Sequence, residues 1–130
     1  MLAVIPPNQF RSFNLPGVTL SQNELDGKHW WVKQKQKEYW HQVVGYTAKR
    51  CPFTPSRANV LITRVSKRLI DPLNVYAGCK WLLDAFVELG WLTGDGYEDI
   101  RIRVDQEKCK KGEEPHMRVT IVYDEPIQAS

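Results

Sequence analysis

Residues 70–95 read I-D-P-L-N-V-Y-A-G-C-K-W-L-L-D-A-F-V-E-L-G-W-L-T-G-D, and this stretch decides the fold. Apolar residues recur along it at helical spacing and predict the buried face of a helix: Val75, Cys79, Leu82, Leu83, Phe86 and Leu89. Asp71 is a favoured N-cap residue, and Pro72 suits the first helical position. D-P-L-N equally predicts a turn, with the helix beginning near Val75. Gly90 is expected to end the helix.

The segments on either side of this helix predict strands. Residues 58–66 are rich in β-branched residues, and their consecutive apolar residues from Val60 predict a central strand. Residues 100–105 alternate as I-R-I-R-V-D, which is typical of a half-buried strand. Residues 117–123 predict a further strand after K-C-K-K-G-E-E-P, which predicts a hairpin connection. We therefore expect a sheet beneath the helix.

A second helix is predicted over residues 28–49, which contain no proline. Its expected apolar stripe consists of Val32, Tyr39, Val43 and Tyr46, with Trp40 and Val44 beside them. The other face carries Lys33, Lys35 and Lys37. These lysines are either the solvated face of an amphipathic helix or contacts to DNA phosphates. Trp30 and Trp31 are predicted to be core residues, with stacking on unpaired bases as the alternative.

The length of 130 residues suits a single domain. Within it, residues 1–18 predict a loop-rich segment, followed by at most one short strand over residues 17–20. Residues 124–130 predict a flexible tail. A hydrophobic content of 42% argues against a disordered chain.

No apolar run approaches the roughly 18 residues that span a bilayer, and the start of the chain is a poor signal peptide. We therefore expect a cytoplasmic protein with no membrane partner. Three widely separated cysteines support neither a disulfide framework nor a zinc site, so we expect reduced thiols. A net charge of +3 is weak evidence for nucleic acid, but the lysines within residues 28–37 have no acid among them and predict a cationic patch.

Three acids can carry chemistry: Asp71 after a strand, Asp84 on the helix and Asp95 in a glycine-flanked loop. Carboxylates brought together from such positions suit Mg²⁺, whose other ligands are waters and phosphates. Such a metal supports phosphodiester hydrolysis, and a nearby lysine, Lys80, would neutralise charge on the phosphate. Each acid also has a plainer interpretation. Asp71 would cap a helix, Asp95 would be a turn residue, and Asp84 would form a surface pair with Lys80.

The order of these residues resembles the RusA family of Holliday-junction resolvases, small metal-dependent endonucleases of bacteria and their prophages. The family pattern is D-x-D-N-L, a lysine, D-A-L and then a pair of acids. The positions that match it are Asp71, Asn74, Lys80, Asp84, Ala85 and Asp95. An upstream stretch resembles phage-type members at Ser21, Asn23, His29, Trp30, Lys33, Lys37 and Trp40. The resemblance covers about residues 19–123.

The resemblance implies an α+β fold in which two main α-helices pack on a small mixed β-sheet. It also implies a homodimer that binds four-way DNA junctions and resolves them by Mg²⁺-dependent, or Mn²⁺-dependent, hydrolysis. The resemblance implies four catalytic residues: Asp71, Lys80, Asp84 and Asp95. Asp71 and Asp95 would bind the metal, Lys80 would contact the scissile phosphate, and Asp84 would support the site. The candidate DNA contacts are Lys33, Lys35, Lys37, Arg68 and Asn74.

Two positions depart from the family pattern. Leu73 stands where the family has its second acid, and Gly94 replaces the first acid of the final pair. The loss of two ligand positions leaves less negative charge to hold Mg²⁺, so Glu98 or Asp99 would have to substitute. The alternative function is therefore a catalytically weakened or inactive relative that binds branched DNA without cleaving it.

Overall fold

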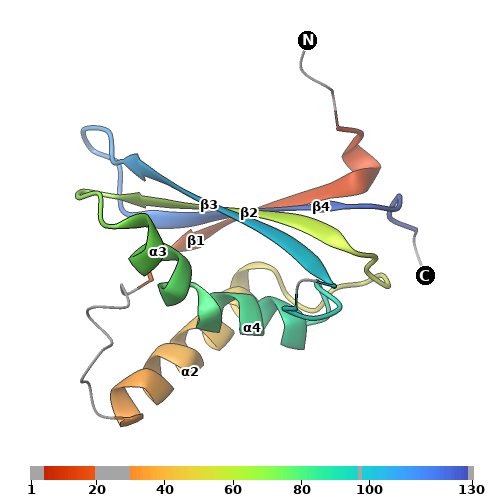
Figure 1. The fold of residues 1–130 in the computed structure, drawn as a ribbon, viewed down its shortest axis with the longest axis horizontal. Coiled ribbons are helices and arrows are strands. Elements are labelled where there is room, and N and C mark those ends of the chain that lie inside the picture. The colour runs from red at the N-terminus through yellow and green to blue at the C-terminus, as the bar shows by residue number, and fades with distance from the viewer. Residues whose placement is uncertain (1–4, 20–29, 97, 129–130) are drawn as a thin grey trace.

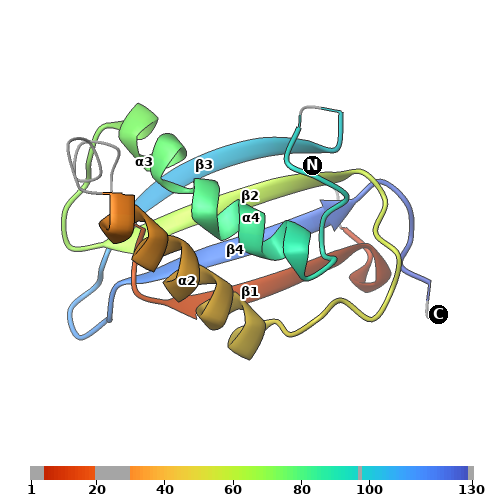
Figure 2. The same cartoon turned by 90° about the horizontal axis from the view of Figure 1, so that it is seen from below.

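The computed structural model describes residues 5–19, 30–96 and 98–128. One layer is a four-stranded sheet, and the helices form a second layer against one face of it (Figure 1). Figure 2 shows α2, α3 and α4 lying across that face. The expected α+β fold, a mixed sheet with two main helices packed on it, is confirmed.

The strands are β1 (Phe10–Pro16), β2 (Ala58–Ser66), β3 (Ile100–Lys108) and β4 (His116–Tyr123), in the spatial order β1-β4-β2-β3. β2 is central, as its apolar run predicts: it pairs in parallel with β3 and antiparallel with β4. β4 also pairs antiparallel with β1. The prediction of a hairpin between β3 and β4 is wrong. β3 lies beside β2 through a helical crossover, as parallel neighbours require, whereas β4 pairs with β2 and β1 on the other side of β2.

Both ends of the chain are more structured than their composition predicts. β1 lies upstream of the strand predicted over residues 17–20, within the segment predicted to be loops. At the other end, the backbone N–H of Ile127 donates to the carbonyl of Asn8 at 2.6 Å, and Ile127 packs against the core. The tail predicted from residue 124 is therefore held as far as Ile127. A short 3-10 helix, η1 (Pro7–Gln9), precedes β1.

Helix α2 (Trp30–Thr47) confirms the helix predicted over residues 28–49, but only part of the predicted apolar stripe is buried. Trp40 and Val44 are buried, whereas Tyr39 and Tyr46 are exposed, Tyr46 at 88%. Aromatic and aliphatic residues occur on both faces of this helix, and the face in contact with α4 is the one that becomes buried.

Trp30 and Trp31, at the start of α2, are exposed at 70% and 48%. The prediction that they are core residues is therefore wrong. The first turns of α2 extend beyond the layer formed by α3 and α4 in Figure 1, so the sheet does not cover them.

The helix predicted after Asp71 is divided at Cys79 into α3 (Pro72–Gly78) and α4 (Lys80–Glu88). The break keeps one face of both segments on the sheet. The predicted stripe residues that are buried are Val75, Cys79, Leu82, Leu83 and Phe86. Gly90 has a φ of +84°, a conformation that glycine adopts without a steric penalty, and ends α4 as predicted.

One hydrophobic core joins the two layers, with Trp40 from α2, Phe86 from α4 and Tyr123 from β4 among its largest members. The hydroxyl of Tyr123 donates to the carbonyl of Trp91 at 2.7 Å, which satisfies a buried polar group. Within the described ranges, no helix combines the length and apolar character needed to cross a membrane.

Candidate functional site

Two acids and a lysine gather where α3, α4 and β3 meet. An open pocket of about 280 Å³ is lined by Tyr76, Ala77, Lys80, Leu83, Asp95 and Ile102. The carboxyl group of Asp84, from α4, hydrogen-bonds to that of Asp95 and so lies beside the pocket. The loop after α4 therefore brings Asp95 back to the helix that carries Lys80 and Asp84.

The pKa of Asp84 is raised above its ordinary value in the folded protein. Burial is the largest cause, followed by the hydrogen bond to Asp95 and the negative charge of Asp95. The positive charges of Lys80 and His41 act in the opposite direction. Two carboxyl groups that share a hydrogen bond must hold a proton between them or a cation beside them.

Lys80 is exposed, and its ammonium group lies 5.1 Å from the centroid of the Trp81 ring. Its effect on the pKa of Asp84 agrees with the predicted proximity of the two residues across one helical turn. The ion pairs found among the described residues do not include Lys80. Its charge is thus available to a phosphate in the pocket.

Asp71 lies at the other end of α3. Its Oδ1 accepts a hydrogen bond from the backbone N–H of Leu73 at 2.9 Å, so the predicted N-cap role is confirmed. The family motif and the helix cap therefore use the same carboxylate.

The position of Asp71 follows from its neighbour, Ile70, whose backbone makes two hydrogen bonds to the side chain of Gln106 on β3. Gln106 is four residues along β3 from Ile102, which lines the Asp95 pocket. Four residues of strand span about 13 Å. The carboxyl group that the structure brings to Asp95 is that of Asp84, and Asp71 does not join this pair.

The loop around Gly94 explains one departure from the family pattern. The hydroxyl of Thr93 donates to Oδ1 of Asp99 at 3.0 Å, which fixes the carboxylate of Asp99 against the loop. A Cβ atom at residue 94 would collide with that carboxylate. Asp99 therefore occupies the space beside Gly94, and an acid at position 94 would require the side chain of Asp99 to move.

Sequence reasoning missed two residues near the carboxyl pair. Tyr76 lines the pocket, and His41 of α2 lies close enough to lower the pKa of Asp84. Nδ1 of His41 is 2.6 Å from Oε2 of Glu88, while its Nε2 is buried with no hydrogen-bond partner among the described residues. No local spacing links His41 to these acids, because the packing of α2 on α4 alone brings them together.

The candidate DNA contacts do not lie on one surface. With 3.6 residues per turn, Lys33 and Lys37 share one side of α2, and Lys35 lies on another. The ammonium group of Lys35 is 5.0 Å from the centroid of the Trp31 ring. The predicted single lysine face is therefore divided.

The remaining candidates belong to the β2–α3 region. Arg68 is exposed in the connection before Asp71, and Asn74 is half-buried in the first turn of α3. Of the residues that carry the upstream resemblance, Ser21, Asn23 and His29 lie outside the described residues.

The donor atoms at the pocket suit one class of metal. In the part of the chain that the structure describes, no three His, Cys, Asp or Glu side chains gather closely enough to hold an ion. Asp84 and Asp95 form a two-carboxylate set, and Mg²⁺ is often held by one or two carboxylates together with waters and substrate phosphates. The pair therefore fits Mg²⁺ or Mn²⁺ bound together with a phosphate group. It does not fit a structural zinc site with four protein ligands.

Comparison with known protein families finds no family model that matches this chain, and comparison with curated proteins finds no match either. The resemblance to the RusA family thus depends on the motif residues alone.

Proposed function

We propose that this protein is a metal-dependent endonuclease that resolves four-way DNA junctions in the cytoplasm. The observation that carries the proposal is the hydrogen-bonded carboxyl pair of Asp84 and Asp95 beside Lys80, in a pocket open to solvent. An acid pair with a lysine at one open pocket is what hydrolysis of a phosphodiester requires. The order of these residues in the RusA-like motif supports the choice of branched DNA.

In the proposed mechanism, the carboxylates of Asp84 and Asp95 would hold Mg²⁺ or Mn²⁺. The metal, when bound, supplies an activated water and stabilises charge on the leaving oxygen. Lys80 neutralises the charge that develops on the phosphate, and the apolar side chain of Ile102 closes one wall of the pocket. A homodimer would present two such pockets to the two strands that a junction resolvase must nick.

The direct test is incubation of the purified protein with labelled four-way junctions and Mg²⁺ or Mn²⁺. We expect paired, symmetric nicks, and a linear duplex of the same sequence serves as the control substrate. Asp95→Asn should abolish the nicks and leave junction binding intact. Absence of nicks in the wild type, or nicks that persist in Asp95→Asn, would refute the proposal.

A second candidate is a relative that binds branched DNA without cleaving it. Leu73, at the position of a family acid, is 80% exposed, and Asp71 is engaged as a helix cap. Both observations leave the carboxyl pair without a third acid. If this candidate is right, the wild type binds the junction without nicking it, and Leu73→Asp brings cleavage activity.

A further inference from the structure

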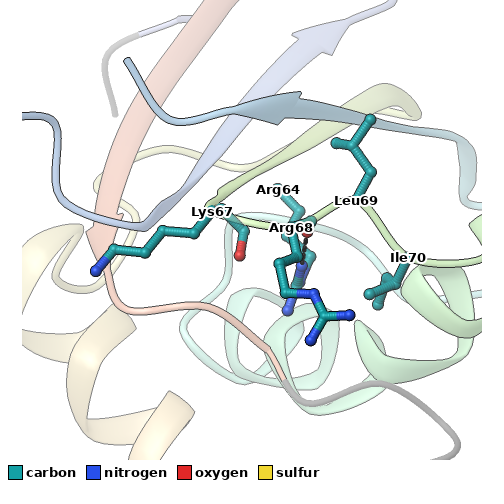
Figure 3. A pocket seen from close by; sticks show the side chains of 6 residues that line it. Arg64, Lys67, Arg68, Leu69 and Ile70 are labelled. Atoms are coloured by element: carbon teal, nitrogen blue, oxygen red, sulfur yellow. Dashed lines mark hydrogen bonds between the residues drawn. The ribbon is translucent and has the colours of Figure 1, made fainter. Parts of the chain in front are cut away.

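A second pocket lies at the opposite end of the β2–β3 pair from Asp95. It has a volume of about 430 Å³ and is lined by Arg64, Ser66, Lys67, Arg68, Leu69 and Ile70 (Figure 3). In the sheet register, Arg64 is beside Gln106, whereas the acidic pocket lies beside Ile102. The two pockets are therefore about 13 Å or more apart along the sheet.

The most informative residue of this pocket is Arg64, which is only 6% exposed. Its Nε donates to the carbonyl of Thr19 and one terminal nitrogen donates to the carbonyl of Arg68, both at 3.4 Å. These are long bonds for a charged donor, and neither acceptor carries a charge. A buried guanidinium without a counter-charge is costly.

No acid among the described residues offsets this charge. The lining of the pocket contains no Asp or Glu, and the ion pairs of the described chain do not include Arg64. Lys67 and Arg68 add two exposed cations at its rim. Figure 3 shows the guanidinium groups of Arg64 and Arg68 on the same side of the connection, with Lys67 directed away from them.

The surrounding surface carries charges of both signs, because Glu113 and Glu114 lie in the same connection as two lysines. The connection between β3 and β4 lies at this end of the sheet in Figure 1 and carries Lys110 and Lys111, both exposed. Lys108, also exposed, is the register partner of Ser66. The excess positive charge is therefore confined to the pocket and its rim, where Arg64, Lys67 and Arg68 lie without an acid in the lining.

We infer that the pocket built by Arg64 and Arg68 binds a phosphate group, and that this phosphate belongs to the backbone of the DNA whose scissile bond lies at the Asp84–Asp95 pair. The choice of DNA as the source rests on the proposed function. Arginine guanidinium groups match phosphate oxygens with paired hydrogen bonds, and phosphate would supply the counter-charge that Arg64 does not find among the described residues. A spacing of at least about 13 Å lets one strand of DNA place different phosphates in the two pockets.

The first measurement uses inorganic phosphate alone. Titration of the full chain, followed by amide NMR shifts, should give a saturable response at Arg68 and Leu69 that chloride at equal ionic strength does not reproduce. Arg68→Gln and Arg64→Met should both lose this response. Arg64 is buried, so Arg68→Gln, at an exposed position, keeps the test valid if Arg64→Met does not fold. A missing or non-saturable phosphate response in the wild type would overturn the site.

The second measurement identifies the source of the phosphate. Affinity for a four-way junction is measured against salt concentration, because each neutralised phosphate contributes about 0.9 to the slope of log K against log salt. Arg68→Gln should reduce this slope by about 0.9. Arg50→Gln is the matched control, since it removes an equal charge from an exposed site after α2, and it should leave the slope unchanged. Equal slopes in the two variants would overturn DNA as the source and assign the pocket to free phosphate.

The two measurements distinguish failure of the proposed nuclease function from failure of the phosphate site. A wild type that neither binds nor nicks the junction, yet responds saturably to phosphate, refutes the nuclease and the DNA source while supporting the phosphate site. A wild type that nicks the junction but shows no phosphate response refutes the inference and leaves the nuclease in place.

Discussion

The acidic pocket and the basic pocket, which lie toward the two ends of the β2–β3 pair, differ in how their charge is satisfied. Asp84 and Asp95 can share a proton, so the acidic pocket is stable without a ligand at the expense of a raised pKa for Asp84. Arg64 has no comparable route, because a guanidinium does not lose its proton. The acidic pocket is therefore expected to change its protonation when a ligand binds, and the basic pocket only to gain a counter-charge.

Asp95→Asn should produce the largest effect and should separate the two pockets by function. We expect junction cleavage to fall by more than about 100-fold, since even loss of a group that supports a metal ligand costs about 10–100-fold. Junction affinity should stay close to that of the wild type. Equal losses of cleavage and affinity would mean that the two pockets do not divide catalysis and binding between them.

Asp71 tests whether the capping acid belongs to the acidic pocket. Asp71→Ala should lower the free energy of unfolding by about 1 kcal/mol, because α3 loses its N-cap. Asp71→Ser restores a capping oxygen and should recover most of this stability in urea denaturation. Cleavage should follow stability in both variants. Cleavage that is lost in Asp71→Ser despite recovered stability would instead make Asp71 a metal ligand.

The pH dependence of stability should report the carboxyl pair. Because the pKa of Asp84 is raised in the folded protein, the folded state binds this proton more tightly than the unfolded chain. The resulting stabilisation is fully present below the ordinary pKa of an aspartate and is lost as pH rises through the raised pKa. Between the ordinary and the raised pKa of Asp84, the stability of Asp84→Asn should therefore fall less steeply with rising pH than that of the wild type. Parallel pH profiles would show that the pair is not coupled.

Binding of Mg²⁺ at the acidic pocket should change the thermal stability of the protein. At neutral pH, added Mg²⁺ should raise the unfolding temperature of the wild type and leave that of Asp84→Asn nearly unchanged. Arg68→Gln, at the basic pocket, should respond to Mg²⁺ like the wild type. A loss of the Mg²⁺ response in Arg68→Gln would place the ion elsewhere.

The smallest expected effect concerns the alkylation rate of Cys79, the residue that joins α3 to α4. Burial, the largest cause, raises the pKa of its thiol to about 11, against smaller opposing effects of Thr19 and Arg64. Alkylation at neutral pH should therefore be slow in the folded protein and should become rapid on unfolding, as mass spectrometry of the modified peptide would show. Rapid alkylation of Cys79 in the folded protein would contradict its burial between the helices and the sheet.

Local pattern predicts much of this fold correctly. The strand at Ala58–Ser66, the cap at Asp71, the buried stripe of α3 and α4 and the stop at Gly90 all follow from short-range rules of spacing and backbone geometry. The errors concern long-range pairing. β1 depends on β4 for its hydrogen bonds, and the buried face of α2 depends on α4, so neither is determined by its own residues.

By itself, the sequence determined the α+β class, the central strand and the acids, lysines and arginines available for chemistry. The tertiary structure decided which of them act together: Asp84 with Asp95, His41 near Asp84, Asp71 apart from them, and Arg64 buried beside Arg68. The physical reason is that helix capping, apolar periodicity and turn geometry act over a few residues, whereas the pairing of charges depends on contacts between distant segments. The packing of α2 on α4 brings His41 to Asp84, which residues 70–95 cannot specify, whereas the contact between Asp84 and Asp95 depends on how the loop after α4 folds back on this helix.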